Sequence, residues 1–317
     1  MRFAGHRAKL RIMVFRTLVD AGTLQALLGA PQLPGTPQPA LVDCRFDLMR
    51  PEAGRQHYLE AHIPGARYAD LTRDLSAPVG AHTGRHPLPT PAAFAAALTR
   101  LGIGNDSQVI AYDNANGSFA ARLWWMLRWV GHDAVAVLDG GFQAWRKRGG
   151  PLQSGEPAPA AAGGRHFRLR PGAVENSAAL AANAAVVTTA SLEHLLFEPA
   201  PGAPKPLLVD ARAPERFAGT AEPIDPVAGH IPGAVNHPFA GNLAADHRFL
   251  PAAELKARWL ERLAGTAPEN LIAMCGSGVT ACHNLLSLEV AGLPGAKLYA
   301  GSWSEWIRDP RRPVARG

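Results

Sequence analysis

The chain has few cysteines and no long uninterrupted hydrophobic run. Only Cys44, Cys275 and Cys282 occur in 317 residues. This odd, sparse set argues against a disulfide framework and favours a reducing, cytoplasmic compartment. No apolar stretch approaches the length of a membrane span, so we expect no membrane partner. No Lys/Arg cluster is interleaved with aromatic residues. The net charge of +6 therefore suggests a basic solvated surface that can gather small anions, and not nucleic-acid binding.

The length is sufficient for two domains of ordinary size, each with its own core. Residues 1–16 carry several basic residues and no acid, a composition shared with organelle-targeting peptides. A second methionine, Met13, stands just before the first expected strand, residues 14–19. We therefore interpret residues 1–13 as a short extension or an upstream start, with a targeting segment as the alternative.

The sequence contains an internal repeat, because four segments of the first half recur in the same order in the second. The best-preserved match is His62-Ile63-Pro64-Gly65-Ala66 with His230-Ile231-Pro232-Gly233-Ala234. The other pairs are residues 18–28 with 186–196, 41–45 with 208–212, and 140–145 with 301–306. Such conserved order and spacing predicts a duplicated domain. Residues 149–164 are rich in proline, glycine and alanine, which is typical of a linker.

Within each copy, short apolar runs alternate with helical patterns. In the first copy we expect strands at residues 41–44, 108–112 and 135–138, and helices at 91–101, 118–130 and 142–148, the first capped by Thr90. This alternation predicts an α/β fold in which each domain is a parallel sheet with helices on both faces. The expected division is 14–148 for the first domain, 149–185 for the linker and 186–317 for the second domain.

The most informative segment surrounds Cys275. An apolar run at residues 270–274 predicts a strand before it, and residues 279–288 predict a helix after it. The connecting residues Gly276, Ser277, Gly278, Val279 and Thr280 form a tight loop in which backbone N–H groups can curl around one point. These donors and the positive end of the helix dipole favour a thiolate, so we expect Cys275 to be a nucleophile.

Two other functions for this segment are disfavoured. The spacing of Cys275, Cys282 and His283 does not match a closed zinc site, so we expect no metal. A cysteine-dependent phosphatase needs an arginine six positions after its cysteine, and Ala281 occupies that position. Cys282 and Cys44 are expected to pack in cores, although Cys282 could resolve an oxidised Cys275 if the two came close.

With its two copies, its Val-Asp-x-Arg and His-Ile-Pro-Gly-Ala motifs and its Cys-Gly-Ser-Gly-Val-Thr-Ala loop, the chain resembles the tandem rhodanese-type sulfurtransferases. The resemblance extends from about Val14 to Arg312. It implies two rhodanese-like domains, of which the first is catalytically silent and the second carries the sulfur. The position that matches Cys275 in the first copy is expected near Asn114, where no thiol occurs.

The resemblance also implies roles for individual residues. Arg216 matches an arginine that grips the anionic substrate, and Ser277 would bond the substrate carbonyl or relay a proton. The uncharged pair Gly276-Ser277 resembles the 3-mercaptopyruvate type, whereas thiosulfate-using relatives tend to carry Arg and Lys there. A second arginine, common in the mercaptopyruvate type, is missing from residues 221–226. Arg85 and His86, on a proline-stiffened loop of the first copy, are expected to approach the active cysteine.

The sequence therefore predicts a sulfurtransferase that moves a sulfane sulfur from a small anionic donor, 3-mercaptopyruvate or thiosulfate, through a persulfide on Cys275. The acceptor would be cyanide, a small thiol or a protein thiol, and neither a metal nor an organic cofactor would be required. The alternative is a non-enzymatic persulfide carrier or binding module that serves a protein partner.

Overall fold

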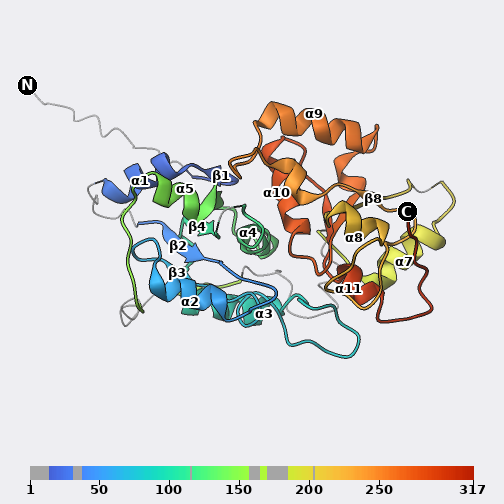
Figure 1. Ribbon diagram of the computed structural model, residues 1–317, viewed down its shortest axis with the longest axis horizontal. Helices are drawn as coiled ribbons and strands as arrows, with labels where there is room; N and C mark the ends of the chain where they lie inside the picture. The colour runs from blue at the N-terminus through green and yellow to red at the C-terminus, as the bar shows by residue number, and fades with distance from the viewer. Residues whose placement is uncertain (1–13, 31–37, 115, 157–164, 170–184, 203) are drawn as a thin grey trace, which may run out of the picture.

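A computed structural model describes residues 14–30, 38–114, 116–156, 165–169, 185–202 and 204–317. They form two five-stranded sheets, one in each half of the chain (Figure 1). The predicted extension, residues 1–13, lies outside the described residues, as do residues 157–164 and 170–184 of the predicted linker. Residues 149–156 and 165–169 of that linker pack on the first domain, where Gln153 pairs with His62 and Phe167 is buried. Its last residue, Ala185, instead accepts the N–H of Leu298 in the second domain.

The first sheet has the strand order β1-β5-β4-β2-β3, and every neighbouring pair is parallel. Its strands are β1 (Leu18–Val19), β2 (Ala40–Asp43), β3 (Arg67–Tyr68), β4 (Val109–Tyr112) and β5 (Val135–Leu138). Its helices are α1 (Ala21–Gly29), α2 (Ala53–Glu60), α3 (Pro91–Arg100), α4 (Ala120–Trp129) and α5 (Gly141–Lys147). Thr90 caps α3 as predicted, because its side chain accepts the N–H of Ala93.

The second sheet repeats this plan in the order β6-β10-β9-β7-β8, again all parallel. Its strands are β6 (Val186–Val187), β7 (Leu207–Asp210), β8 (Val235–Asn236), β9 (Leu271–Met274) and β10 (Lys297–Tyr299). Its helices are α7 (Thr189–Phe197), α8 (Pro214–Ala218), η1 (Phe239–Asn242), α9 (Ala252–Leu263), η2 (Pro268–Asn270), α10 (Ala281–Val290) and α11 (Ser302–Trp306). The predicted α/β architecture with two parallel sheets is confirmed.

One predicted element is shorter than expected. The first strand was expected over residues 14–19, but only Leu18 and Val19 pair with β5. Phe15 is instead held by the side chain of Gln108, whose Oε1 accepts the Phe15 N–H at 2.9 Å. The backbone at Phe15 therefore bonds to a side chain and not to a strand, while the carbonyl of Thr17 still accepts the N–H of Val137 in β5.

Both faces of each sheet are buried, which explains why the strands are apolar at successive positions. In β4, Val109 and Ala111 join the core on one face, while Ile110 and Tyr112 join the core on the other. The first of these cores continues into the second domain. Among the described residues, no helix is long and apolar enough to cross a membrane.

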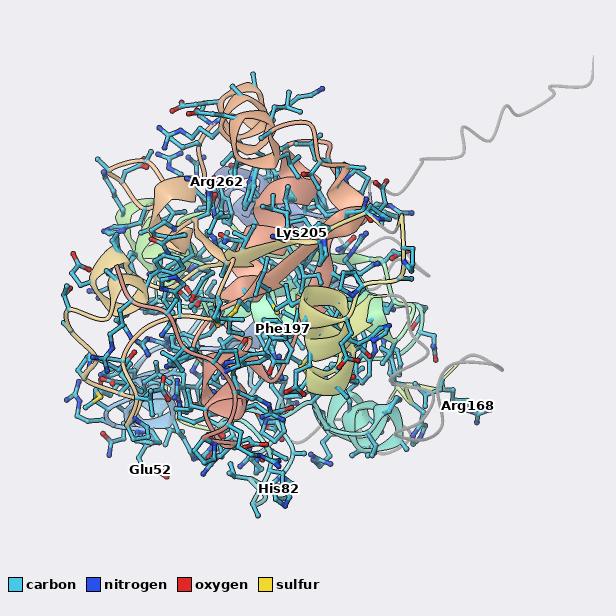
Figure 2. All side chains as sticks on the ribbon, turned by 90° about the vertical axis from the view of Figure 1, so that its right-hand side faces the viewer. Glu52, His82, Arg168, Phe197, Lys205 and Arg262 are labelled. Carbon is cyan, nitrogen blue, oxygen red and sulfur yellow. The ribbon has the colours of Figure 1, made fainter. Side chains whose placement is uncertain are left out.

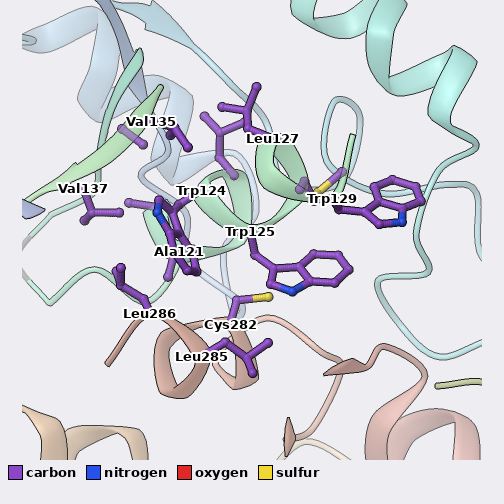
Figure 3. Packing of buried hydrophobic residues seen from close by; sticks show 14 of the residues in the cluster. Ala121, Trp124, Trp125, Leu127, Trp129, Val135, Val137, Cys282, Leu285 and Leu286 are labelled. Atoms are coloured by element: carbon purple, nitrogen blue, oxygen red, sulfur yellow. The ribbon is translucent and has the colours of Figure 1, made fainter. Parts of the chain in front are cut away.

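The two domains meet where α4 packs against α10. Figure 3 shows Trp125 of α4 above Cys282 and Leu285 of α10, and all three side chains belong to one buried cluster. Because this cluster contains residues from both sheets, the domains share a continuous apolar core along this face. The shared core fixes residues of the first domain next to the loop at the start of α10.

Candidate active site

Cys275 follows β9 directly and opens the loop that leads into α10. The loop can turn this tightly because Gly278 adopts a left-handed conformation with φ of +77°. A Cβ at this position would also lie 2.4 Å from the carbonyl oxygen of Ala300. Only glycine fits both constraints, as the sequence pattern suggested.

Cys275 is enclosed at the start of this loop, and only 2% of the residue is exposed. The N–H of Gly278 donates to Sγ at 3.1 Å. The N–H groups of Ser277, Val279 and Thr280 donate to no other group in the described part of the chain, so they remain available to an anion. Together with the N-terminus of α10, these donors can stabilise a negative charge on sulfur.

Ser302 stabilises the start of the Cys275 loop by a hydrogen bond, a role that was not predicted from the sequence. Its Oγ accepts the N–H of Cys275 at 3.1 Å and donates to the carbonyl of Tyr299 at 2.9 Å. Ser302 has a φ of +52°, and its repeat partner Gly141 has a φ of +57°. The sequence signal that could have identified this role is that Ser302 stands where the first copy has a glycine, Gly141.

Ser277 of the loop contacts His86 from the first domain. The distance between Ser277 Oγ and His86 Nδ1 is 2.8 Å. Burial, followed by the charges of Arg122 and Arg85, lowers the pKa of His86 to about 3, so its imidazole is neutral at pH 7. The structure therefore brings two predicted site residues from different domains into hydrogen-bond contact.

The loop that carries His86 lies between β3 and α3 and passes beneath α11 in Figure 1. His82, near its tip, projects outward at the lower edge of Figure 2. The loop is anchored to the second domain, since the N–H of Arg85 donates to Ser304 Oγ at 3.0 Å and that of Gly84 to Glu305 Oε2 at 3.2 Å. These bonds hold Arg85 and His86 in place next to the Cys275 loop.

Arg85 and Arg216 meet over the Cys275 loop. A Cβ on Gly276 would lie 2.9 Å from Nη2 of Arg85 and 3.4 Å from Nη2 of Arg216. Both guanidinium groups are also paired with carboxylates, Arg216 with Glu222 and both arginines with Asp225. Residues 221–226, which lack the expected second arginine, thus supply two carboxylates to the site, and sequence reasoning missed them.

A third arginine reaches the loop from the first domain. Arg122 of α4 is fully buried, and its guanidinium donates to the carbonyls of Gly278 and His86, each at 3.1 Å. In the described chain its Nε has no hydrogen-bond partner. Arg122 therefore links the Cys275 loop to the loop of His86, and its charge is buried beside them.

In the first domain, a carboxylate occupies the position of the thiol. Tyr112 pairs with Asp43 as Met274 pairs with Asp210, so Asp113 is the equivalent of Cys275. The expected position, near Asn114, is thereby narrowed to Asp113. Oδ1 of Asp113 accepts the N–H of Gly117 at 3.0 Å, and Oδ2 accepts that of Phe119 at 2.9 Å. The N–H groups of this first-domain loop are therefore already bonded to the side chain of Asp113.

The other cysteines are buried in cores. Burial raises the pKa of Cys282 to about 12 and that of Cys44 well above its usual value, so both remain thiols. His283 is turned away from them, because its Nε2 lies 2.9 Å from the carbonyl of Asn116 and its Nδ1 3.2 Å from Asn242 Nδ2. Throughout the described ranges, no group of three His, Cys, Asp or Glu side chains is arranged to hold a metal.

Residues 21–148 and 196–309 both match the rhodanese-like domain. The chain is 49% identical over 302 residues to a probable 3-mercaptopyruvate sulfurtransferase of Pseudomonas aeruginosa, an alignment that covers 95% of this chain and 98% of the relative. It is 37% identical to the thiosulfate sulfurtransferase of Rattus norvegicus, covering 83% and 84% of the two chains.

Among solved structures, the 3-mercaptopyruvate sulfurtransferase from Leishmania major superposes with a TM-score of 0.76 at 30% identity. The superposition covers 93% of this chain and 76% of that one. The chain therefore belongs to the rhodanese family, in two copies, and is a sulfurtransferase of the 3-mercaptopyruvate or thiosulfate type.

Proposed function

We propose that the enzyme transfers the sulfur of 3-mercaptopyruvate, in preference to that of thiosulfate, to a thiophilic acceptor through a persulfide on Cys275. The observation that carries this proposal is the surroundings of Sγ. The sulfur accepts the Gly278 N–H at 3.1 Å, further backbone N–H groups of the same loop have no partner in the described chain, and two guanidinium groups lie over that loop.

The reaction consists of two displacements at sulfur. The Cys275 thiolate attacks the sulfur of 3-mercaptopyruvate, the C–S bond breaks, and its electron pair passes to carbon as the enolate of pyruvate, which then takes a proton. With thiosulfate, the S–S bond breaks and sulfite leaves with the electron pair. An acceptor such as cyanide or a thiolate attacks the outer sulfur and returns Cys275 to the thiolate.

The pair Ser277 and His86 suits the oxygen of a carbonyl donor. A neutral imidazole whose Nδ1–H donates to Ser277 Oγ leaves the serine hydroxyl free to donate to the developing enolate oxygen. Thiosulfate has no carbonyl group and forms no enolate that this hydroxyl could stabilise. The pair therefore supports 3-mercaptopyruvate as the preferred donor.

Arg216 and Arg85 are proposed to receive the carboxylate of the donor. A guanidinium can hold a carboxylate through two parallel N–H groups. Nε of Arg85 is buried and has no partner in the described part of the chain, so its N–H can donate a new hydrogen bond without losing one. The donor would thus be held between the two domains.

Steady-state kinetics with the two donors test this proposal, with cyanide as the acceptor. We expect kcat/KM to be about tenfold higher for 3-mercaptopyruvate than for thiosulfate, which corresponds to about 1.4 kcal/mol in transition-state binding. Ping-pong kinetics are expected because the persulfide separates the two half-reactions. Equal or reversed preference would assign the enzyme to the thiosulfate type. Turnover with neither donor would favour a persulfide carrier that serves a protein partner.

A further inference from the structure

The carboxylate of Asp225 lies between the two guanidinium groups proposed to receive the donor. Its Oδ1 pairs with Arg85 Nη1, and its Oδ2 lies 3.0 Å from Arg216 Nη2. The Asp225 side chain is 2% exposed, whereas those of Arg85 and Arg216 are 26% and 16% exposed. The carboxylate is therefore enclosed, whereas both arginine side chains remain partly exposed.

In the described chain the Asp225 carboxylate accepts no backbone N–H of its own segment. Glu222 does so instead, and its Oε1 accepts the N–H groups of Ile224 and Asp225, both at 3.1 Å. Glu222 also binds Arg216 Nε at 2.9 Å and Arg212 Nη1 at 3.4 Å. The hydrogen bonds of the Asp225 carboxylate within the described chain go to the two arginines alone.

The position of Asp225 reduces the charge that a donor meets. The exposed guanidinium groups face the loop at Gly276, next to the nucleophile. Without Asp225, the guanidinium groups of Arg85 and Arg216 would both face the donor. Glu222 would then be the remaining carboxylate: it pairs with Arg216 but is shared with Arg212. One negative charge within contact distance of both guanidinium groups offsets about half of their attraction for an anion.

We propose that Asp225 determines donor specificity by charge: it tunes the two-arginine site to a singly charged α-keto carboxylate and disfavours a doubly charged donor such as thiosulfate. The inference deepens the proposed function and rests on it for the identity of the donor. Its physical basis is that a dianion gains twice the Coulomb energy of a monoanion when the same negative charge is removed.

The test is a series of reagents of increasing charge applied to the full-length wild type and to Asp225→Asn. Neutral iodoacetamide and singly charged iodoacetate alkylate Cys275, and the rates are followed on the Cys275 peptide. 3-Mercaptopyruvate and thiosulfate are compared by kcat/KM. For Asp225→Asn we expect no change with iodoacetamide, about threefold faster reaction with the two monoanions and about tenfold higher kcat/KM for thiosulfate.

Two further variants serve as controls. Asp225→Glu retains the charge and should keep the wild-type order of rates. Glu254→Gln removes an exposed carboxylate that is also paired with an arginine, Arg258, and should change none of the four rates. Thermal unfolding of each variant checks that the fold is intact.

The inference is overturned if Asp225→Asn lowers the rates with all anionic reagents alike. That result would mean that Asp225 only holds the arginines in position. It is also overturned if the ratio of the iodoacetate rate to the iodoacetamide rate is unchanged. This ratio needs no sulfur transfer, so it remains informative if the wild type uses neither donor and the proposed function itself fails.

Discussion

At the scale of single residues, Ser302 combines an unfavourable backbone conformation with a useful hydrogen bond. The left-handed region costs a residue with a Cβ about 1–2 kcal/mol, yet its Oγ accepts the N–H of Cys275. Ser302→Gly should relieve the strain and lose the bond, so the free energy of unfolding should change little while kcat/KM falls. Ser302→Ala should lose the bond and keep the strain.

Denaturant unfolding and donor kinetics check this pair. The alanine variant should be less stable than the glycine variant by about 1 kcal/mol. Both should lose activity to a similar extent, because both lack the hydroxyl. Full activity in either variant would show that the Cys275 loop does not need this support.

Arg216 provides the second prediction at this scale. Arg216→Ala should lower kcat/KM about tenfold to a hundredfold, mainly through KM, because a charge-assisted pair contributes about 1.5–3 kcal/mol. Arg216→Lys should restore only part of this loss, since an ammonium lacks the planar fork. Alkylation of Cys275 by iodoacetamide should stay near the wild-type rate. Unchanged kcat/KM for both donors would make Arg85 the better candidate for donor binding.

At the scale of elements, α4 carries a buried charge across the domain interface to the active-site loop. Arg122 holds the carbonyls of Gly278 and His86, so Arg122→Gln should loosen both loops and weaken the positive potential at the sulfur. We expect kcat to fall by about one to two orders of magnitude, together with slower alkylation of Cys275 by iodoacetamide at neutral pH.

Arg128→Gln is the matched control for Arg122. Arg128 lies on the same helix and also crosses the interface, where it pairs with Glu289 of α10 at 3.2 Å, but its side chain is 26% exposed. Its loss should leave kcat nearly unchanged. Equal effects of the two substitutions would mean that Arg122 acts through the packing of the interface and not on the site.

The elements themselves could largely be predicted from the sequence. Apolar runs and the Thr90 cap indicated β4, β5, β9 and α3 to within a residue or two, because local patterns determine them. The partners of Arg122 could not be predicted, since the helix of Arg122 reads as an apolar core segment. The role of Asp225 was missed for a related reason. Its partners Arg85 and Arg216 lie in different domains, and a single sequence does not show which residues of two domains form ion pairs.

At the scale of the whole molecule, buried histidines couple stability to pH. Burial lowers the pKa values of His86 and His283 to about 3 and also lowers that of His237. The unfolded chain binds protons on these groups near pH 6.5, and the folded protein does not. Their contribution is therefore fully present above pH 6.5 and is lost as the pH falls from 6.5 toward 3.

The free energy of unfolding should decrease by up to about 1.4 kcal/mol per pH unit for each such histidine below pH 6.5. Denaturant unfolding at several pH values between 7.5 and 5 measures this slope. His283→Asn should reduce the slope, and substitution of the exposed His194 should not change it. A stability that is constant over this range would contradict these assignments.

The central claim, that Cys275 carries the transferred sulfur, is tested most directly by the mass of the enzyme after reaction with 3-mercaptopyruvate in the absence of an acceptor. We predict a gain of one sulfur atom, located on the Cys275 peptide and lost on addition of cyanide. Cys275→Ser should show no gain and no turnover, while Cys282→Ser and Cys44→Ser should behave as the wild type. A sulfur found on another residue, or substantial turnover by Cys275→Ser, would contradict the account.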